Sequence, residues 1–316
     1  LGFGTIVFLS KFLNPIELGQ VKLIQAYGAF FIILGLFGYN LSTLKLCSEK
    51  RPNIEKVKIF ALSTKKIFLM SILSSMAMIL LSTFGLLSQD ETVSRWLIIY
   101  AIIIPFAALG YTFTAYLQAL KKIKEMAKLQ VIVRLQFIFF IFLATYYLGF
   151  KGLMNSTILS YIVGTLVYLK STGFGFLKYI NIKDRYPKFE HYAIFTLLGG
   201  LVTIFGQYSD MYLIDYLESD RELIGFYSLS TVFFMGSVVV IGTVQSIITP
   251  HFSENQNNKV WQKKNWIKYQ SLAIILAIFV AISMYALTYL LIKYYLGIEY
   301  NIALDYVGIF MIKFIV

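Results

Sequence analysis

The chain has 316 residues, of which 58% are hydrophobic and only 14% are charged, and its mean hydropathy is +0.73. Ordinary soluble domains hold roughly 45–50% apolar and about 25% charged residues, so this composition excludes a disordered tail, a disulfide scaffold and a cytosolic enzyme, and it indicates a polytopic membrane protein. The 28 Lys and Arg residues against 16 Asp and Glu give a net charge of +12, a surplus that cytoplasmic loops of membrane proteins carry without binding nucleic acid.

The apolar segments predict ten membrane-spanning helices. Eight stretches are long enough to cross a hydrocarbon core of about 30 Å, at residues 22–44, 67–88, 96–119, 129–149, 153–172, 192–217, 223–249 and 269–293. Residues 1–13 and the last apolar stretch are shorter, and we expect them to be truncated spans; a cleaved signal peptide is the alternative for the first. Because backbone groups in lipid must be satisfied within each segment, the spans are expected to be helices.

The charges alternate between loops and thereby predict an orientation. The loops at 42–66, 119–135, 170–192 and 250–270 hold most of the Lys and Arg residues, whereas the loops between them are nearly neutral or acidic. The positive-inside rule places the chain start and the four basic loops in the cytoplasm. In the last of these loops Trp261 and Trp266 alternate with lysines, a mixture typical of a short amphipathic helix at anionic lipid headgroups. An ordinary basic loop is the alternative.

Two stretches of the chain resemble each other. Glu17-Leu18-Gly19 aligns with Glu222-Leu223-Ile224-Gly225, so that Gly19 falls on Gly225, and the helices that follow stay in register to Ser48-Glu49 and Ser253-Glu254. Six predicted spans separate equivalent points, so both units enter from the same face and the repeat is parallel. The match contains only a few identities, and chance similarity is the alternative.

The order of several short motifs resembles a known family. They are Asn14-Pro15-Ile16-Glu17-Leu18-Gly19-Gln20, Tyr116-Leu117-Gln118-Ala119-Leu120-Lys121-Lys122, Asp210-Met211-Tyr212-Leu213-Ile214 and Ile224-Gly225-Phe226-Tyr227-Ser228. With two six-helix lobes, they look like a polysaccharide flippase of the O-antigen or capsule repeat-unit type, in the multidrug/oligosaccharidyl-lipid/polysaccharide exporter superfamily.

The resemblance implies an all-α integral membrane transporter in the bacterial inner membrane, with an N-terminal lobe at 1–190 and a truncated C-terminal lobe at 191–316. It also implies alternating access between the lobes and a substrate that is an oligosaccharide on undecaprenyl pyrophosphate. The expected partners are this lipid-linked oligosaccharide, anionic membrane lipids, and a glycan polymerase or chain-length protein. Nucleic acid and organic cofactors are not implied.

Ionisable residues inside the predicted spans are candidates for the substrate path, because each costs roughly 2.5–3.5 kcal/mol to insert at a helix centre. Asp210 lies well inside its span and is the strongest candidate, for a role in proton or ion coupling. A structural ion pair is the alternative. Lys11 is its expected partner, or else it reaches the outer headgroups. Arg134 is suited to hold a phosphate at the inner mouth, or else it anchors the interface.

Uncharged polar groups and one proline complete the set of candidates. Gln25, Asn40, Gln207 and Tyr208 lie within spans, where they either bond neighbouring helices or line a sugar path. Pro105 interrupts the 96–119 span, and we expect it to act as a hinge or to be passively tolerated.

Other classes of function fit the sequence less well. A membrane enzyme would need an acidic or metal-binding cluster, but the longest loops are basic, and the acids Asp215, Glu218, Asp220 and Glu222 are expected to form a solvated turn. The single cysteine, Cys47, excludes an internal disulfide and a multi-cysteine metal site. We therefore expect neither a catalytic nor a metal site. A drug or cation antiporter of the same superfamily is the closer alternative, and would favour acids over Lys11 in the cavity.

Overall fold

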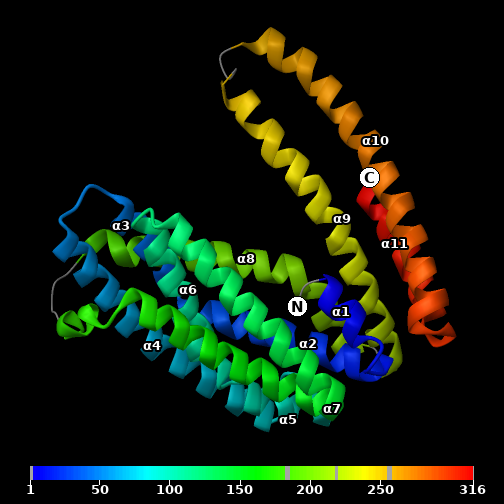
Figure 1. Cartoon of the computed structure of the whole chain (residues 1–316), viewed down its shortest axis with the longest axis horizontal. Helices are drawn as coiled ribbons and strands as arrows, with labels where there is room; N and C mark the ends of the chain where they lie inside the picture. The colour runs from blue at the N-terminus through cyan, green and yellow to red at the C-terminus, as the bar shows by residue number, and fades with distance from the viewer. Residues whose placement is uncertain (1–2, 182–185, 218–219, 255–257, 316) are drawn as a thin grey trace. The chain divides into compact units, whose positions relative to one another are not determined.

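The computed structural model describes residues 3–181, 186–217, 220–254 and 258–315 (Figure 1). Within these ranges every regular element is a helix, as predicted. The helices are α1 (Phe3–Leu9), α2 (Pro15–Leu36), α3 (Tyr39–Ser48), α4 (Asn53–Thr83), α5 (Glu91–Tyr100), α6 (Ile103–Ala119), α7 (Ile123–Thr172), η1 (Gly175–Tyr179), α8 (Pro187–Leu217), α9 (Arg221–Glu254), α10 (Lys259–Leu291), η2 (Ile292–Leu296), η3 (Ile298–Tyr300) and α11 (Asn301–Ile315).

Several of these helices are long and apolar enough to cross a membrane. Among the described residues there are six, or seven if the bent pair α5 and α6 forms one span. The helix α7 counts once in this total, and α1, α3 and α11 are too short to be counted. The chain is therefore a multi-pass membrane protein, while the count of ten spans stays a prediction.

The chain divides into two compact units. Unit 1 comprises residues Leu1–Gly19 and Asp220–Val316, and unit 2 comprises Gln20–Ser219. The predicted lobe boundary after residue 190 does not coincide with either boundary of unit 2, because α8 groups with the helices that precede it. The lobes at 1–190 and 191–316 remain a prediction from the repeat.

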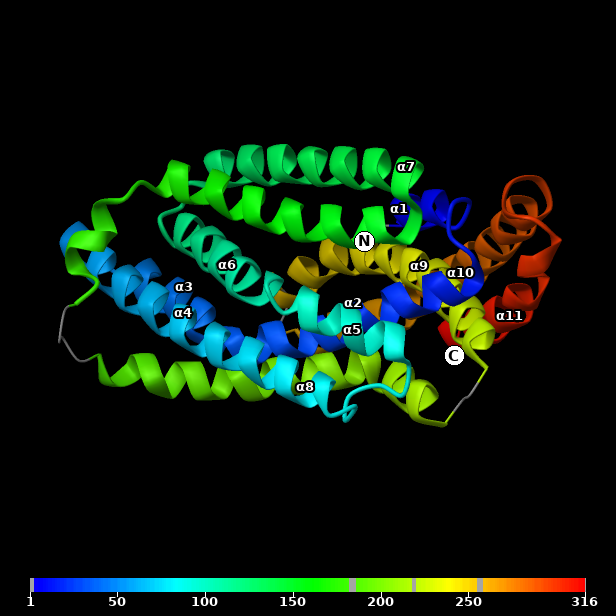
Figure 2. The ribbon, with the colours of Figure 1, turned by 90° about the horizontal axis from the view of Figure 1, so that it is seen from below.

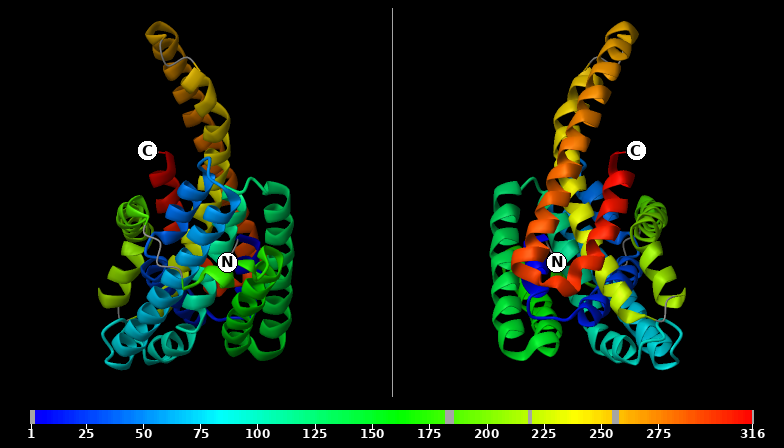
Figure 3. Two further views of the ribbon diagram at one scale, coloured as in Figure 1. Left: turned by 90° about the vertical axis from the view of Figure 1, so that its left-hand side faces the viewer. Right: turned by 90° about the vertical axis from the view of Figure 1, so that its right-hand side faces the viewer.

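Within unit 2, α7 is a hairpin of two antiparallel arms (Figures 2 and 3). The chain reverses at Gly149, whose φ of 57° and ψ of −138° are not helical. The arms stay in register, since the rings of Phe137 and Tyr161 lie 6.1 Å apart and the Ser171 hydroxyl donates to Glu125 at 2.7 Å. The two arms correspond to the predicted spans at 129–149 and 153–172.

The helices of unit 2 are tied together by hydroxyl groups that donate to carbonyls of neighbouring helices. Ser74 of α4 donates to Phe31 O at 2.6 Å, and Thr165 of α7 donates to Phe106 O at 2.7 Å. Thr196 of α8 donates at 3.0 Å to the carbonyl of Gly38, where α2 gives way to α3. Such bonds and close packing hold helices together in lipid, where apolar burial does not favour association.

The ends of unit 2 differ in charge. The described basic connections at 49–52, 120–122 and 173–181 lie at one end, and the connection at 84–90 and the turn at Gly149 lie at the other (Figures 1 and 2). Lys65 of α4 donates to Asn181 at 3.3 Å, which joins two basic segments at the first end. This arrangement follows the predicted alternation of loop charge; the cytoplasmic assignment of the basic end stays a prediction.

The predicted basic loops are shorter than expected, because helices extend into them. The helix α4 begins at Asn53, α7 at Ile123 and α10 at Lys259. Lysine favours helices; Pro52 directly precedes α4, and the left-handed Lys121 (φ 60°) lies between α6 and α7. Trp261 and Trp266 therefore lie on the first turns of the long helix α10, and a separate amphipathic helix is wrong there.

In unit 1, α9 packs against α1, α10 and α11, and the segment after α1 is bonded to the last residue of η3. Ser230 of α9 donates to the carbonyl of Ala303 at 2.9 Å. The Tyr300 side chain is fully buried, and its hydroxyl lies 3.1 Å from Ser10 O and 3.0 Å from Leu13 O. This phenol therefore fixes the segment between α1 and α2.

The two glycines that the repeat aligns lie against each other in unit 1. A Cβ atom on Gly225 would stand 1.9 Å from the carbonyl oxygen of Pro15, and one on Gly19 would stand 2.9 Å from Gly225 N. These contacts are backbone atoms that a side chain cannot displace cheaply. Both positions therefore require glycine for the close approach of the first turns of α2 and α9.

We expect Gly225→Ala to destabilise the folded protein by about 1–3 kcal/mol or more, because overpacking at a backbone contact forces the helices apart. Thermal unfolding in detergent, followed by the loss of the monodisperse chromatographic peak, measures this effect. Gly199→Ala is the matched control, because a Cβ there meets nothing within 4 Å. Equal melting temperatures for both variants and the parent would contradict the prediction.

Candidate functional site

Three of the predicted site residues lie on neighbouring turns of α8. Asp210 is half-buried, and its Oδ1 accepts a hydrogen bond from the amide of Met211 at 2.8 Å. Tyr208 is half-buried and Gln207 is exposed. The C-terminal half of α8 thus carries these three polar groups in a helix that is apolar enough to cross a membrane.

The helix α8 packs against α2, which carries another predicted residue. The Tyr212 hydroxyl donates to Ala26 O at 2.8 Å, and the rings of Phe205 and Phe30 are 5.7 Å apart. Gln25, next to Ala26, is half-buried. Asn40 is also half-buried and lies at the start of α3, just beyond α2.

Arg134 lies on the first arm of α7 and is exposed. Its guanidinium carbon is 5.8 Å from the ring of Phe137, which in turn packs edge-on against Tyr161 of the second arm. The guanidinium also lies within electrostatic range of the Tyr161 hydroxyl. Arg134 therefore belongs to an aromatic environment.

Four tyrosines from four helix segments of unit 2 come together near Arg134. They are Tyr100 of α5, Tyr111 of α6, Tyr161 of the second α7 arm and Tyr208 of α8, and we call them the tyrosine cluster. The Tyr100 hydroxyl interacts electrostatically with those of the other three, and Tyr161 interacts with Tyr111 and Tyr208. Tyr100 is buried, Tyr161 and Tyr208 are half-buried, and Tyr111 is 50% exposed. The structure thus brings the predicted residues Arg134 and Tyr208 to the same cluster.

Three side chains on the α7 arms have buried polar atoms without a hydrogen-bond partner among the described residues. They are the amide of Gln136, at both its nitrogen and its oxygen, and the hydroxyls of Thr145 and Ser160. The register that places Phe137 beside Tyr161 puts Gln136 and Ser160 at the level of the tyrosine cluster. Buried polar groups in proteins normally have partners, so this level of the hairpin holds unused hydrogen-bonding capacity.

Lys11 lies in unit 1, just after α1, and is exposed. Its ammonium nitrogen is 4.9 Å from the ring centroid of Tyr295, also in unit 1, at the distance of a cation–π contact. The predicted pairing of Lys11 with Asp210 would join different units and stays a prediction.

Pro105 is the third residue of α6 and follows a break. The helices α5 and α6 meet at an angle of 51° with Ala101 and Ile102 between them. Proline has no N–H to donate to the carbonyl four residues earlier, that of Ala101. The Ala101 carbonyl instead accepts from the Ile104 amide at 3.2 Å and from the Ser75 hydroxyl of α4 at 2.6 Å. A bend therefore lies where Pro105 predicts one, and its role as a hinge stays a prediction.

Asp215 corrects a prediction from the sequence. We expected it in a solvated turn, but α8 continues to Leu217 and the Asp215 side chain is only 1% exposed. Its oxygens accept hydrogen bonds from Tyr27 at 2.9 Å and from Ser88 at 3.1 Å. Asp220 and Glu222 are exposed as expected, and Glu218 lies outside the described residues. Asp215 thus ties α8 to α2 and to the connection between α4 and α5.

We expect Asp215→Ala to lower the free energy of unfolding by about 1–3 kcal/mol, because two buried hydroxyls lose this acceptor. Thermal unfolding in detergent measures the change, with Glu91→Ala as the control on an exposed helix N-terminus. The prediction fails if Asp215→Ala melts at the same temperature as the parent.

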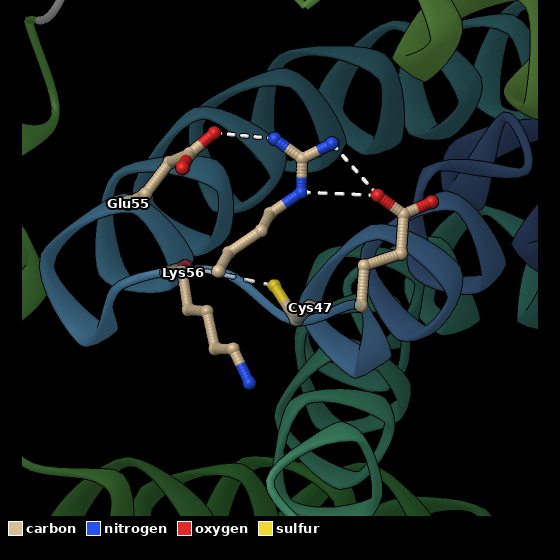
Figure 4. Close-up of polar contacts among 5 residues, drawn as sticks. Cys47, Glu55 and Lys56 are labelled. Carbon is tan, nitrogen blue, oxygen red and sulfur yellow. Dashed lines mark hydrogen bonds and ion pairs between the residues drawn. The ribbon is translucent and has the colours of Figure 1, made fainter.

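The basic end of unit 2 holds a compact polar cluster around the connection from α3 to α4 (Figure 4). Arg51 donates to Glu49 at 2.8 Å and also pairs with Glu55. The buried Cys47 thiol donates to the carbonyl of Lys56 at 3.6 Å. Burial raises the pKa of Cys47 to about 12, and this effect outweighs the cations Lys56 and Arg51, which lower it.

We expect Cys47 to resist alkylation in the folded protein. The thiolate is the reacting form, and at neutral pH a pKa of about 12 leaves about 1,000-fold less thiolate than an ordinary cysteine has. Maleimide labelling at pH 7.5, read by mass spectrometry before and after denaturation, should show labelling only of the unfolded chain. Rapid labelling of the native protein would contradict the buried position.

Sequence reasoning missed part of this site. It did not single out Tyr100, Tyr111 or Tyr161, because tyrosines are common in membrane helices as interfacial anchors. It did not single out Gln136 either. A usable signal is that Tyr161 and Tyr168 are seven residues apart, and so lie on one face of the second α7 arm. Within the described residues no three His, Cys, Asp or Glu side chains are grouped so that they could hold a metal ion.

Comparisons with known proteins agree with this fold. The family model described as "Polysaccharide biosynthesis protein" matches residues 1–256. A solved structure, described as the inward-facing conformation of a multidrug resistance MATE family transporter of the MOP superfamily, has a TM-score of 0.74 at 12% identity, and the match covers 99% of this chain and 77% of that one. No curated protein matches the sequence. This chain belongs to the polysaccharide biosynthesis protein family and shares its fold with that solved structure.

Proposed function

We propose that this protein is a flippase that moves oligosaccharide repeat units, linked to undecaprenyl pyrophosphate, across the bacterial inner membrane. Family membership over residues 1–256 is the observation that carries the proposal. The structural neighbour shares the fold at 12% identity, so its multidrug substrate is not transferred to this chain.

The physical task fits the observed chemistry. A lipid tail can remain in the bilayer, but its polar headgroup needs polar surfaces within a layer about 30 Å thick. Unit 2 supplies Asp210, Gln207 and Tyr208 on α8 and Arg134 on α7, and both helices are long and apolar enough to cross a membrane. Because inserting such groups costs energy, their presence supports a transport role.

The mechanism that we propose is alternating access between two lobes related by the parallel repeat. Lys11, Arg134, Asn40 and Gln25 would contact the pyrophosphate and sugars, Asp210 would couple transport to a proton or an ion, and the bend before Pro105 would act as a hinge. The basic end of unit 2 would face the cytoplasm, where anionic lipids and a glycan polymerase or chain-length protein are the expected neighbours.

Deletion of the gene in its host should stop the appearance of the surface glycan and cause lipid-linked repeat units to accumulate on the cytoplasmic side. Asp210→Ala should have the same effect while the protein stays in the membrane at the parental level. Glycan immunoblots and extraction of labelled lipid-linked sugars measure these outcomes. Glu91→Ala, an exposed acid remote from α8 in sequence, is the control and should restore the glycan.

Two results would count against the proposal. Normal surface glycan in the deletion strain would remove the flippase function. Increased sensitivity to cationic drugs with unchanged glycan would favour the alternative, a drug or cation antiporter of the same superfamily. Parental glycan levels with Asp210→Ala would remove only Asp210 from the mechanism.

A further inference from the structure

The tyrosine cluster of unit 2 is unusual in its chemistry for the interior of a membrane helix bundle. Each phenol offers one donor, acceptor lone pairs and a flat apolar face. The hydroxyls of Tyr100, Tyr111, Tyr161 and Tyr208 lie within electrostatic range of one another, although they come from three helices and one arm of a hairpin. Their exposure rises from the buried Tyr100 to the half-exposed Tyr111.

The level of the hairpin at this cluster also has hydrogen-bonding groups in excess of their partners. The Gln136 amide can donate two hydrogen bonds and accept two, and both of its polar atoms are buried and unpaired within the described ranges. The Ser160 hydroxyl is in the same situation. A ligand that both donates and accepts hydrogen bonds would use this capacity.

We propose that the tyrosine cluster binds a sugar ring of the transported glycan, with Gln136 as an additional hydrogen-bonding residue and Arg134 at the edge of the site. This inference rests on the proposed function. A sugar ring has an apolar face of C–H groups that packs on phenol rings, and its hydroxyls both donate and accept. The phenols of Tyr111, Tyr161 and Tyr208 offer the complementary surfaces.

The charge around the cluster favours a neutral or anionic ligand over a cation. Arg134 lies within electrostatic range of Tyr161, and its guanidinium would repel a cationic drug at this end of the site. A phosphate alone would use Arg134 but not the phenol rings. The combination of phenols, an amide and one cation therefore matches a sugar that stands close to a phosphate.

Site-specific photo-crosslinking in cells tests the contact directly. Benzoylphenylalanine replaces Tyr111 or Tyr161 in the full-length protein, and cells are labelled with a radioactive sugar precursor of the lipid-linked repeat unit. We expect ultraviolet light to attach labelled glycan at both positions. The controls replace Tyr147 on α7 and Tyr216 on α8, each 72% exposed. Absence of label at positions 111 and 161, or equal label at all four positions, would overturn the proposal.

Removal of hydroxyls tests the chemistry of recognition. Tyr111→Phe and Tyr161→Phe keep the rings but remove one hydrogen-bonding group each, which weakens binding by about three- to ten-fold per site. The double variant should therefore lose crosslinking from a probe at position 208 by about ten-fold, at parental membrane levels. Tyr147→Phe with Tyr216→Phe should leave it unchanged, and an equal loss there would contradict the site.

The two experiments together distinguish a failure of the proposed sugar site from a failure of the proposed function. If deletion of the gene stops export but the double Phe variant crosslinks and exports like the parent, the tyrosine cluster is not a sugar site and the flippase function stands. If deletion leaves the surface glycan intact, the proposed function fails first.

Discussion

The structure depends on finding partners for polar backbone groups in a medium that offers no water. At two breaks between helices of unit 2, a hydroxyl from a neighbouring helix donates to a carbonyl at the break. Ser75 donates to Ala101 O at the break before Pro105, and Thr196 donates to Gly38 O at the break between α2 and α3. The same requirement places Tyr27 and Ser88 on the buried carboxylate of Asp215. Hydrogen bonds between helices therefore occur at these two breaks, and they hold the helices of unit 2 against one another.

The same constraint makes polar side chains without a hydrogen-bond partner costly. Most serines and threonines in the spans donate to a carbonyl, as Ser74 does to Phe31. Ser82, Gln136, Thr145 and Ser160 depart from this pattern among the described residues, and two of them, Gln136 and Ser160, lie at the level of the tyrosine cluster. In lipid an unpaired amide costs more than it does in water. A transported headgroup that visits this level would satisfy it in part of the transport cycle.

The sequence predicted features that depend on local patterns. Apolar runs gave the helices, alternating loop charge gave the two ends of unit 2, and Pro105 predicted the region of the bend. The alignment of Gly19 with Gly225 identified two residues that lie in backbone contact. Features that depend on packing were out of reach, because no local pattern distinguishes Asp215, buried on Tyr27, from the exposed Asp220 five residues later.

The candidate site likewise contains residues that the sequence predicted and residues whose role depends on packing. Arg134 and Tyr208 were predicted as polar groups in spans, and the structure brings both to one cluster. Tyr111 and Tyr161 were not predicted, since their proximity depends on how α6 packs against the second arm of α7, which no local pattern in the sequence indicates. Helix extension in turn moved Trp261 from an expected interfacial segment into the first turn of α10.

The central claim is that this protein moves a lipid-linked glycan between leaflets, and translocation in proteoliposomes tests it most directly. Purified full-length protein is reconstituted into vesicles that carry labelled undecaprenyl-pyrophosphate oligosaccharide on both leaflets, and a membrane-impermeant glycosidase is added outside. The account predicts that about half of the label is protected in protein-free vesicles and that the protein makes most of the protected half accessible over time. Protection that stays the same with and without the protein, across imposed proton and sodium gradients, would contradict it.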